Sequence, residues 1–149
     1  MREARPLAER ALAIDEATLG PDHPNVATDL GNLAGIMRNL GLPGEARPLA
    51  ERALTIAEVA QSPDHPGVAT RLNGLALILQ DLGLAGEARP LAERALAIAE
   101  AALGPDHPVV AILLNNLAAI LRELGLADDA RRLRERARSA GQAAGDGGM

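Results

Sequence analysis

The chain has 149 residues, a formal net charge of −5 at pH 7 and 15 Arg, with no Lys, Cys, Trp, Tyr or Phe. It therefore offers no thiolate nucleophile, thiolate metal site, Schiff-base lysine or aromatic stacking platform, and we expect no enzymatic activity, no cofactor and no metal site. The acidic charge, and the lack of an apolar run near the ~20 residues of a membrane span, predict a cytoplasmic chain with no nucleic acid and no membrane as partner.

The chain is built from a 42-residue repeat. Two motifs recur at this interval: Glu-Ala-Arg-Pro-Leu-Ala-Glu-Arg-Ala-Leu begins at Glu3, Glu45 and Glu87, and Pro-Asp-His-Pro begins at Pro21, Pro63 and Pro105. Residues 45–86 and 87–128 are identical at 30 of 42 positions. A fixed period of this length is typical of repeat proteins whose units stack side by side.

Residues 3–19 are predicted to form one helix, which ends at the first Pro-Asp-His-Pro turn. His23 precedes Pro24, and proline suits the first position of a new helix. We expect Asp or His in this motif to cap the backbone donors of that helix. Stacked helices lie about 10 Å apart, so the equivalents His65 and His107 are too far away to share a metal ion with His23. The acidic residues Asp15 and Glu16 are interpreted as part of a solvated surface.

The first complete pair of helices follows Pro24. Apolar residues recur there at three- and four-residue spacing, which predicts a helix with one buried face: Val26, Leu30, Leu33, Met37 and Leu40. Gly41 predicts a left-handed stop. A second helix is expected to begin near Glu45, with Pro48 in its first turn, and to end at Gln61.

Short connections make the two helices antiparallel neighbours, and each pair must stack on the next one to bury its apolar face. The sequence thus predicts an all-α fold, an α-solenoid of antiparallel helix pairs with about three and a half repeats and seven helices. The solenoid covers residues 1–140, with a half repeat at 3–19 and repeats at 24–61, 66–103 and 108–140. Residues 141–149 are predicted to be a disordered Gly/Ala tail. The unpartnered helix 3–19 is interpreted as a cut edge or as a face that another chain covers.

The copies differ most on one face of the first helix of each pair. Six positions within an arc of roughly 120° read Thr28/Thr70/Ile112, Gly31/Asn73/Asn115, Asn32/Gly74/Asn116, Gly35/Leu77/Ala119, Arg38/Gln80/Arg122 and Asn39/Asp81/Glu123. One interpretation is that each helix presents different chemistry to a bound segment, because Asn can both donate to and accept from a peptide backbone. The alternative is that solvent-facing positions vary freely.

Taken together, these motifs resemble the 42-residue tetratricopeptide repeat of kinesin light chains. The resemblance covers about residues 3–138 and lies in Gly-Pro-Asp-His-Pro-x-Val-Ala, Leu-x-x-Leu-Ala with Asn, Leu-Gly, and Glu-Ala-Arg-Pro-Leu-x-Glu-Arg-Ala-Leu-x-Ile. It implies a right-handed superhelix whose first helices line a concave groove for partner segments. Groove contacts then carry over to Asn32, Asn73, Asn115 and Asn116.

The leading hypothesis is a protein–protein interaction module that binds a peptide segment in this groove, as part of a larger regulatory or scaffold protein. The predicted peptide-binding residues are Thr28, Asn32, Arg38, Asn39, Thr70, Asn73, Leu77, Gln80, Ile112, Asn115, Asn116 and Arg122. Among them, Arg38 and Arg122 are candidates for binding a partner carboxylate. The alternative is a structural or self-assembling solenoid spacer, with possible self-association through the N-terminal helix 3–19 and no peptide ligand.

Overall fold

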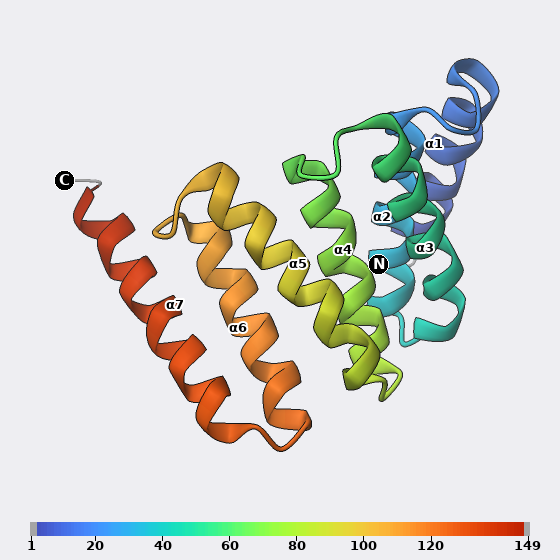
Figure 1. Ribbon diagram of the computed structural model, residues 1–149. Helices are drawn as coiled ribbons and strands as arrows, with labels where there is room; N and C mark the ends of the chain where they lie inside the picture. Colours follow the sequence, from blue (N-terminus) through green and yellow to red (C-terminus); the bar gives the residue numbers. More distant parts are fainter. Residues whose placement is uncertain (1–2, 148–149) are drawn as a thin grey trace.

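The computed structural model describes residues 3–147, with side chains through residue 143, and contains seven helices in that range (Figure 1). Their bounds are α1 Ala4–Leu19, α2 Pro24–Asn39, α3 Pro43–Ala60, α4 Pro66–Asp81, α5 Ala85–Leu103, α6 Pro108–Glu123 and α7 Ala127–Gly147. No strand occurs in this part of the chain. The predicted all-α solenoid is confirmed, and we call α2, α4 and α6 the A helices and the other four the B helices.

Each helix packs on the next one in chain order, from α1 at one end of the molecule to α7 at the other (Figure 1). The A helices also touch one another directly, α2 with α4 and α4 with α6. Leu30, Leu72 and Leu114 are fully buried at the same place in the three A helices. Alanines such as Ala46 and Ala88 are fully buried in the B helices, where small side chains let neighbouring helices approach closely.

A histidine caps each A helix. Nδ1 of His23, His65 and His107 accepts a hydrogen bond from the backbone N–H two residues later, at 3.0, 2.9 and 3.1 Å. Each bond satisfies one of the free donors in the first helical turn. The predicted cap is therefore confirmed, and it is His rather than Asp that supplies it.

Each A helix ends at a left-handed glycine. Gly41 has φ of +79°, and Leu42 donates a backbone hydrogen bond of 2.9 Å to Met37 while Gly41 donates one of 3.0 Å to Arg38. These two bonds define a Schellman motif, which occupies carbonyls that the helix end leaves free. The predicted stop is confirmed. Leu40, however, was expected in the buried stripe and is 37% exposed, because it is the residue that caps the helix rather than part of its packed face.

Two predicted boundaries are wrong. α3 begins at Pro43, two residues earlier than expected, so Pro48 lies in the second turn. α5 begins at the equivalent Ala85, which shows that the preceding turn fixes the start whether or not a proline is present.

α7 continues to Gly147, although residues 141–149 were predicted to be disordered. Ala140 is still buried, and alanine is the best helix former, so the helix extends beyond the predicted end. Residues 148–149 lie outside the described part.

A ladder of ion pairs joins successive B helices. Arg52 lies 3.4 Å from Glu16, Arg94 lies 3.2 Å from Glu58, and Arg136 lies 2.8 Å from Glu100. Arg52 and Arg94 also donate hydrogen bonds to the carbonyls of Pro21 and Pro63. Exposed pairs contribute little stability each, typically under about 1 kcal/mol. The same type of contact recurs at each step from one B helix to the next, between α1 and α3, α3 and α5, and α5 and α7.

Candidate functional site

The twelve predicted binding residues all lie on the A helices, and none of them is fully buried. We call the surface that they form the A-helix face. Its position follows from the helical period, because the apolar residues that pack into the core, such as Leu30 and Leu33, are on the other side of the same helices. None of the described helices is both long and apolar enough to cross a membrane.

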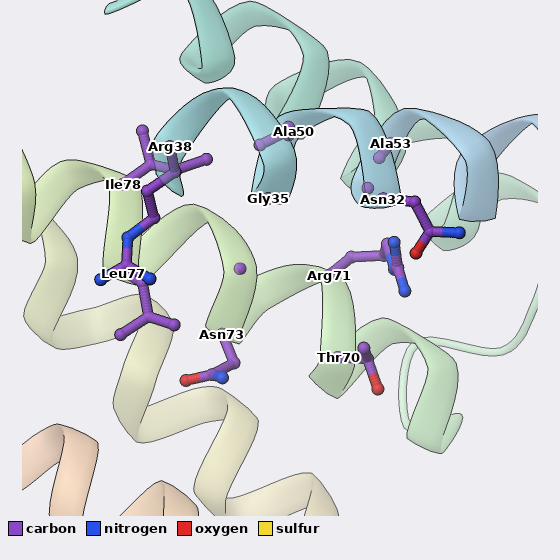
Figure 2. Close-up of a pocket in the computed structure, with 13 residues that line it drawn as sticks. Asn32, Gly35, Arg38, Ala50, Ala53, Thr70, Arg71, Asn73, Leu77 and Ile78 are labelled. Carbon is purple, nitrogen blue, oxygen red and sulfur yellow. The ribbon is translucent and has the colours of Figure 1, made fainter. Parts of the chain in front are cut away.

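A first hollow lies between α2 and α4 and has a volume of about 280 Å³ (Figure 2). Five predicted residues line this α2–α4 hollow: Asn32, Arg38, Thr70, Asn73 and Leu77. Its floor contains the small residues Gly31, Gly35 and Gly74. Asn32 and Asn73 can each donate and accept hydrogen bonds, so the hollow presents polar groups that suit a peptide backbone.

A second hollow lies between α4 and α6 and has a volume of about 410 Å³. Thr70, Asn73 and Ile112 are the predicted residues that line this α4–α6 hollow. Its remaining lining is largely apolar and includes Val109, which is 41% exposed, and Leu103. Because Thr70 and Asn73 line both hollows, the two are adjacent and share α4 as a common wall.

The other six predicted residues line neither of these two hollows. Thr28 lines a third hollow of about 240 Å³ near the start of α2, which shares Thr70 and Arg71 with the α2–α4 hollow. The remaining five line none of the three hollows: Asn39, Gln80, Asn115, Asn116 and Arg122. Asn116 is linked to the site indirectly, because its Nδ2 donates a hydrogen bond of 3.2 Å to Oδ1 of Asn73. The structure therefore gathers only part of the predicted set.

The structure also gives Arg38 a partner within the chain. Its Nε lies 2.5 Å from Oδ2 of Asp81, in the next A helix, and its Nη2 lies 3.4 Å from Oδ1. One repeat further on, Nε2 of Gln80 donates a hydrogen bond of 2.7 Å to Glu123. A partner carboxylate at Arg38 would have to compete with Asp81, and the role of Arg38 in binding such a carboxylate stays a prediction.

Arg71 lines the α2–α4 hollow but was not among the residues predicted from the sequence. It extends from α4 across α2, where its Nη1 donates a hydrogen bond of 3.4 Å to the carbonyl of Ala27. A methyl group on Gly31 would lie only 1.5 Å from the same nitrogen, so Gly31 leaves the space that the guanidinium occupies. Burial lowers the pKa of Arg71 from its usual value. Comparing the copies could have revealed it, because the same position is Asp29 in α2 and Leu113 in α6.

Asp29 also forms a contact that the sequence did not predict. It is hydrogen-bonded to Asp15 of α1, and its pKa is raised to about 6, first by burial and then by the hydrogen bond and charge of Asp15. Oδ2 of Asp29 is buried without a hydrogen-bond partner among the described residues. Asp15 is thus not simply a solvated residue as expected, and the neighbouring Glu16 pairs with Arg52.

Within the described residues, no group of three or more His, Cys, Asp or Glu side chains is placed to hold a metal ion. The groups that the A-helix face does present are amides, hydroxyls, aliphatic side chains and the guanidinium groups of Arg38 and Arg122. Such groups bind through hydrogen bonds, apolar contacts and charge pairing.

Comparisons of both sequence and structure find similarity to tetratricopeptide repeat proteins. The profile of the tetratricopeptide repeat family matches residues 1–58, 30–83 and 68–143. No curated protein matches the chain by sequence. Among solved structures, BtubC (BKLC) from P. vanneervenii is 27% identical, with a TM-score of 0.83 over 94% of this chain and 56% of that one. A Podospora anserina kinesin light chain with nearly identical TPR-like repeats is 29% identical, with a TM-score of 0.73 over 93% of this chain and 66% of that one.

The tetratricopeptide domain of Arabidopsis FLU is 18% identical, with a TM-score of 0.66 over 76% of this chain and 92% of that one, a likeness in fold alone. The chain spans 56% and 66% of the lengths of the first two structures. The similarity to kinesin-light-chain-type repeats confirms the resemblance seen in the sequence.

Proposed function

Because the chain belongs to the tetratricopeptide repeat family, whose repeats are generally protein–protein interaction modules, we propose that its A-helix face binds an extended segment of a partner protein. The observation that carries this proposal is the pair of adjacent hollows that share Thr70 and Asn73. They form one track across α2, α4 and α6. In this proposal the chain acts by binding rather than catalysis, as part of a larger regulatory or scaffold protein.

The size of the track sets the length of the partner segment. Packed helices are about 10 Å apart and an extended chain advances about 3.3 Å per residue, so about three residues bridge one A helix to the next. A segment of about eight residues would cover both hollows. Asn32, Thr70 and Asn73 would hydrogen-bond its backbone, while Leu77 and Ile112 would contact its apolar side chains.

The composition also limits the affinity. Interface hot spots are usually Trp, Tyr or Arg, and this chain has neither Trp nor Tyr. We therefore expect affinities for a single segment in the micromolar range.

The test uses a random library of 12-residue peptides displayed on phage, panned on the immobilised chain. Selected peptides are then synthesised, and their dissociation constants are measured by fluorescence anisotropy. Thr70→Glu places a charge where the two hollows meet and should weaken binding at least tenfold, since it buries an unpaired carboxylate against the peptide. Selection of no peptide, or equal binding by Thr70→Glu, would contradict the proposal.

Thr55→Glu is the matched control. Thr55 lies on α3, is exposed like Thr70, and forms the same hydrogen bond to the carbonyl four residues earlier. The two substitutions therefore change helix propensity and net charge equally. Binding should be unchanged in Thr55→Glu, and circular dichroism should give the same helicity for both variants.

A second candidate function is self-association through α1, which one observation favours. Leu7 is 65% exposed and Ile14 is 51% exposed, whereas the equivalent Ile56 and Ile98 are 5% exposed. An apolar face of this kind is a common contact surface between chains.

Sedimentation velocity tests this second candidate across a range of protein concentrations. Self-association should appear as a sedimentation coefficient that rises with concentration and falls back to the monomer value in Ile14→Asp. Val59→Asp, at an 83% exposed position on α3, is the control and should change nothing. A monomer at all concentrations would contradict self-association.

A further inference from the structure

We propose that Arg71 recognises a carboxylate of the partner, so that the segment bound on the A-helix face carries an Asp or Glu that pairs with Arg71 in the α2–α4 hollow. This inference rests on the proposed function, because it specifies the chemistry of the partner segment. It assigns the role to a residue outside the predicted binding face.

The placement of Arg71 leaves most of its hydrogen-bonding capacity available. A guanidinium carries five N–H donors, and among the described residues only Nη1 of Arg71 finds an acceptor, at 3.4 Å from the carbonyl of Ala27. None of the described carboxylates lies within ion-pair distance of it. Figure 2 shows the side chain reaching across the hollow toward Asn32, with Thr70 and Asn73 on the same helix.

The scaffold itself does not require a charge at this position. Leu113 occupies the same place in α6 and is buried, with 6% of its surface exposed. Placing an unpaired guanidinium there is unfavourable, because burial removes water without supplying a counter-charge. The guanidinium also occupies the space above Gly31. Its unfavourable burial is explained if a bound ligand supplies the missing anion.

The other arginines of the A helices differ from Arg71. Arg38 already pairs with Asp81. Arg122 is exposed and lines neither hollow. Arg71 is the arginine whose charge both faces the α2–α4 hollow and lacks a partner within the described residues. A planar guanidinium binds a carboxylate through two parallel hydrogen bonds, and the nearby amide of Asn32 can donate a further one.

The neighbouring hollow defines the rest of the motif. The α4–α6 hollow is lined by Val109, Ile112 and Leu113, so it suits an apolar side chain. With about three extended residues between neighbouring A helices, the partner segment should combine one acidic residue with an aliphatic residue about three positions away. The net charge of −5 does not attract such a segment from a distance, so recognition depends on this local pair.

The experiment pans the same 12-residue phage library on the wild-type chain and on Arg71→Gln. Peptides selected by the wild type should share an Asp or Glu about three positions from an aliphatic residue, and those selected by Arg71→Gln should not. One selected peptide and its analogue with Asn or Gln at the acidic position are then titrated against both proteins. Because a charged hydrogen-bonded pair is involved, the wild type should prefer the acidic peptide about tenfold, and Arg71→Gln should bind both peptides equally.

Two further variants control for folding and for charge. Arg71→Leu restores the residue found at position 113 and should fold, yet lose the preference for the acidic peptide. Arg10→Gln, at an exposed position on α1 away from the hollows, also removes one positive charge and should keep the preference. If wild-type peptides show no acidic residue while Thr70→Glu still abolishes their binding, the proposed function stands and the role of Arg71 is wrong. If no peptide binds, or if Arg71→Gln retains the tenfold preference, the role of Arg71 is likewise excluded.

Discussion

The third hollow, near the start of α2, and the α4–α6 hollow occupy equivalent places in successive repeats. Each lies between successive A helices, and α4 forms a wall of both. The first contains the guanidinium of Arg71, whereas the second is lined largely by aliphatic side chains. The difference arises at three equivalent pairs of positions: Gly67 and Val109, Thr70 and Ile112, and Arg71 and Leu113. A repeat that is otherwise nearly identical thus supplies the framework, and a few substitutions on one face determine what each hollow can bind.

The largest expected effect comes from the shared wall. Leu72 is fully buried in α4, so Leu72→Ala should lower the free energy of unfolding by about 3 kcal/mol through lost contacts and a new cavity. Urea denaturation followed by circular dichroism measures this change. Leu7→Ala, at a 65% exposed site, should change stability by less than about 0.5 kcal/mol. Equal effects of the two substitutions would show that α4 is not the central support of both hollows.

The next prediction replaces Arg71, which makes the first hollow more similar to the second. Arg71→Leu should raise the free energy of unfolding by about 1–2 kcal/mol, because it replaces an unpaired, half-buried charge with the residue that α6 buries. Arg122→Leu removes an exposed arginine from an A helix and should have almost no effect. A loss of stability in Arg71→Leu would mean that the guanidinium has a structural role within the chain.

The contact between Asp15 of α1 and Asp29 of α2 should make stability depend on pH. The pKa of Asp29 is raised to about 6, above its unfolded value, so the folded state binds this proton more tightly than the unfolded state. Its contribution is therefore fully present below about pH 4 and is lost as the pH rises through about 6. Asp29→Asn should remove that dependence and raise stability at pH 7 by about 1 kcal/mol.

Melting curves of the wild type and Asp29→Asn from pH 4 to pH 8 check this prediction. The carboxylates other than Asp15 titrate alike in both proteins, so the difference between the two curves reports on the Asp15–Asp29 pair. That difference should grow between pH 4 and pH 6 and then level off. A constant difference would show that Asp29 is ionised throughout this range.

The smallest effect concerns the glycine beneath Arg71. In the Arg71→Leu background, Gly31→Ala should stabilise α2 by up to about 1 kcal/mol through helix propensity. In the wild type the added methyl group must displace the guanidinium of Arg71, and this displacement should offset the gain in stability. Gly74→Ala faces open space and should be stabilising in both backgrounds. Equal effects of Gly31→Ala in the two backgrounds would show that Arg71 does not lie over Gly31.

The repeat made most of the fold predictable, because period, caps and stops are local in sequence. The 42-residue interval, the His caps and the Gly41 turn each follow from a few neighbouring residues. Contacts between repeats were harder to predict. Arg38 pairs with Asp81, 43 residues away, and Asp15 meets Asp29 only when α1 packs on α2. Such pairs depend on the rotation between helices, which the repeat length alone does not define.

Arg71 was missed for a related physical reason. Its position lies about 60° beyond the predicted arc on a helical wheel, so the periodicity places it toward the core. In α6 that expectation is correct, because Leu113 is buried. The longer side chain of Arg71 instead extends away from the core and lies over α2, where Gly31 leaves space. Comparing charge as well as polarity between the copies would have revealed it.

The central claim is that partner segments bind on the A-helix face, and amide chemical-shift mapping tests it most directly. A peptide selected on the wild-type chain is titrated into the isotopically labelled protein, and the shifted backbone amides are assigned. We predict that the largest changes fall on α2, α4 and α6 around Asn32, Thr70 and Ile112. Changes concentrated on α3 and α5, with the A helices unaffected, would contradict the account.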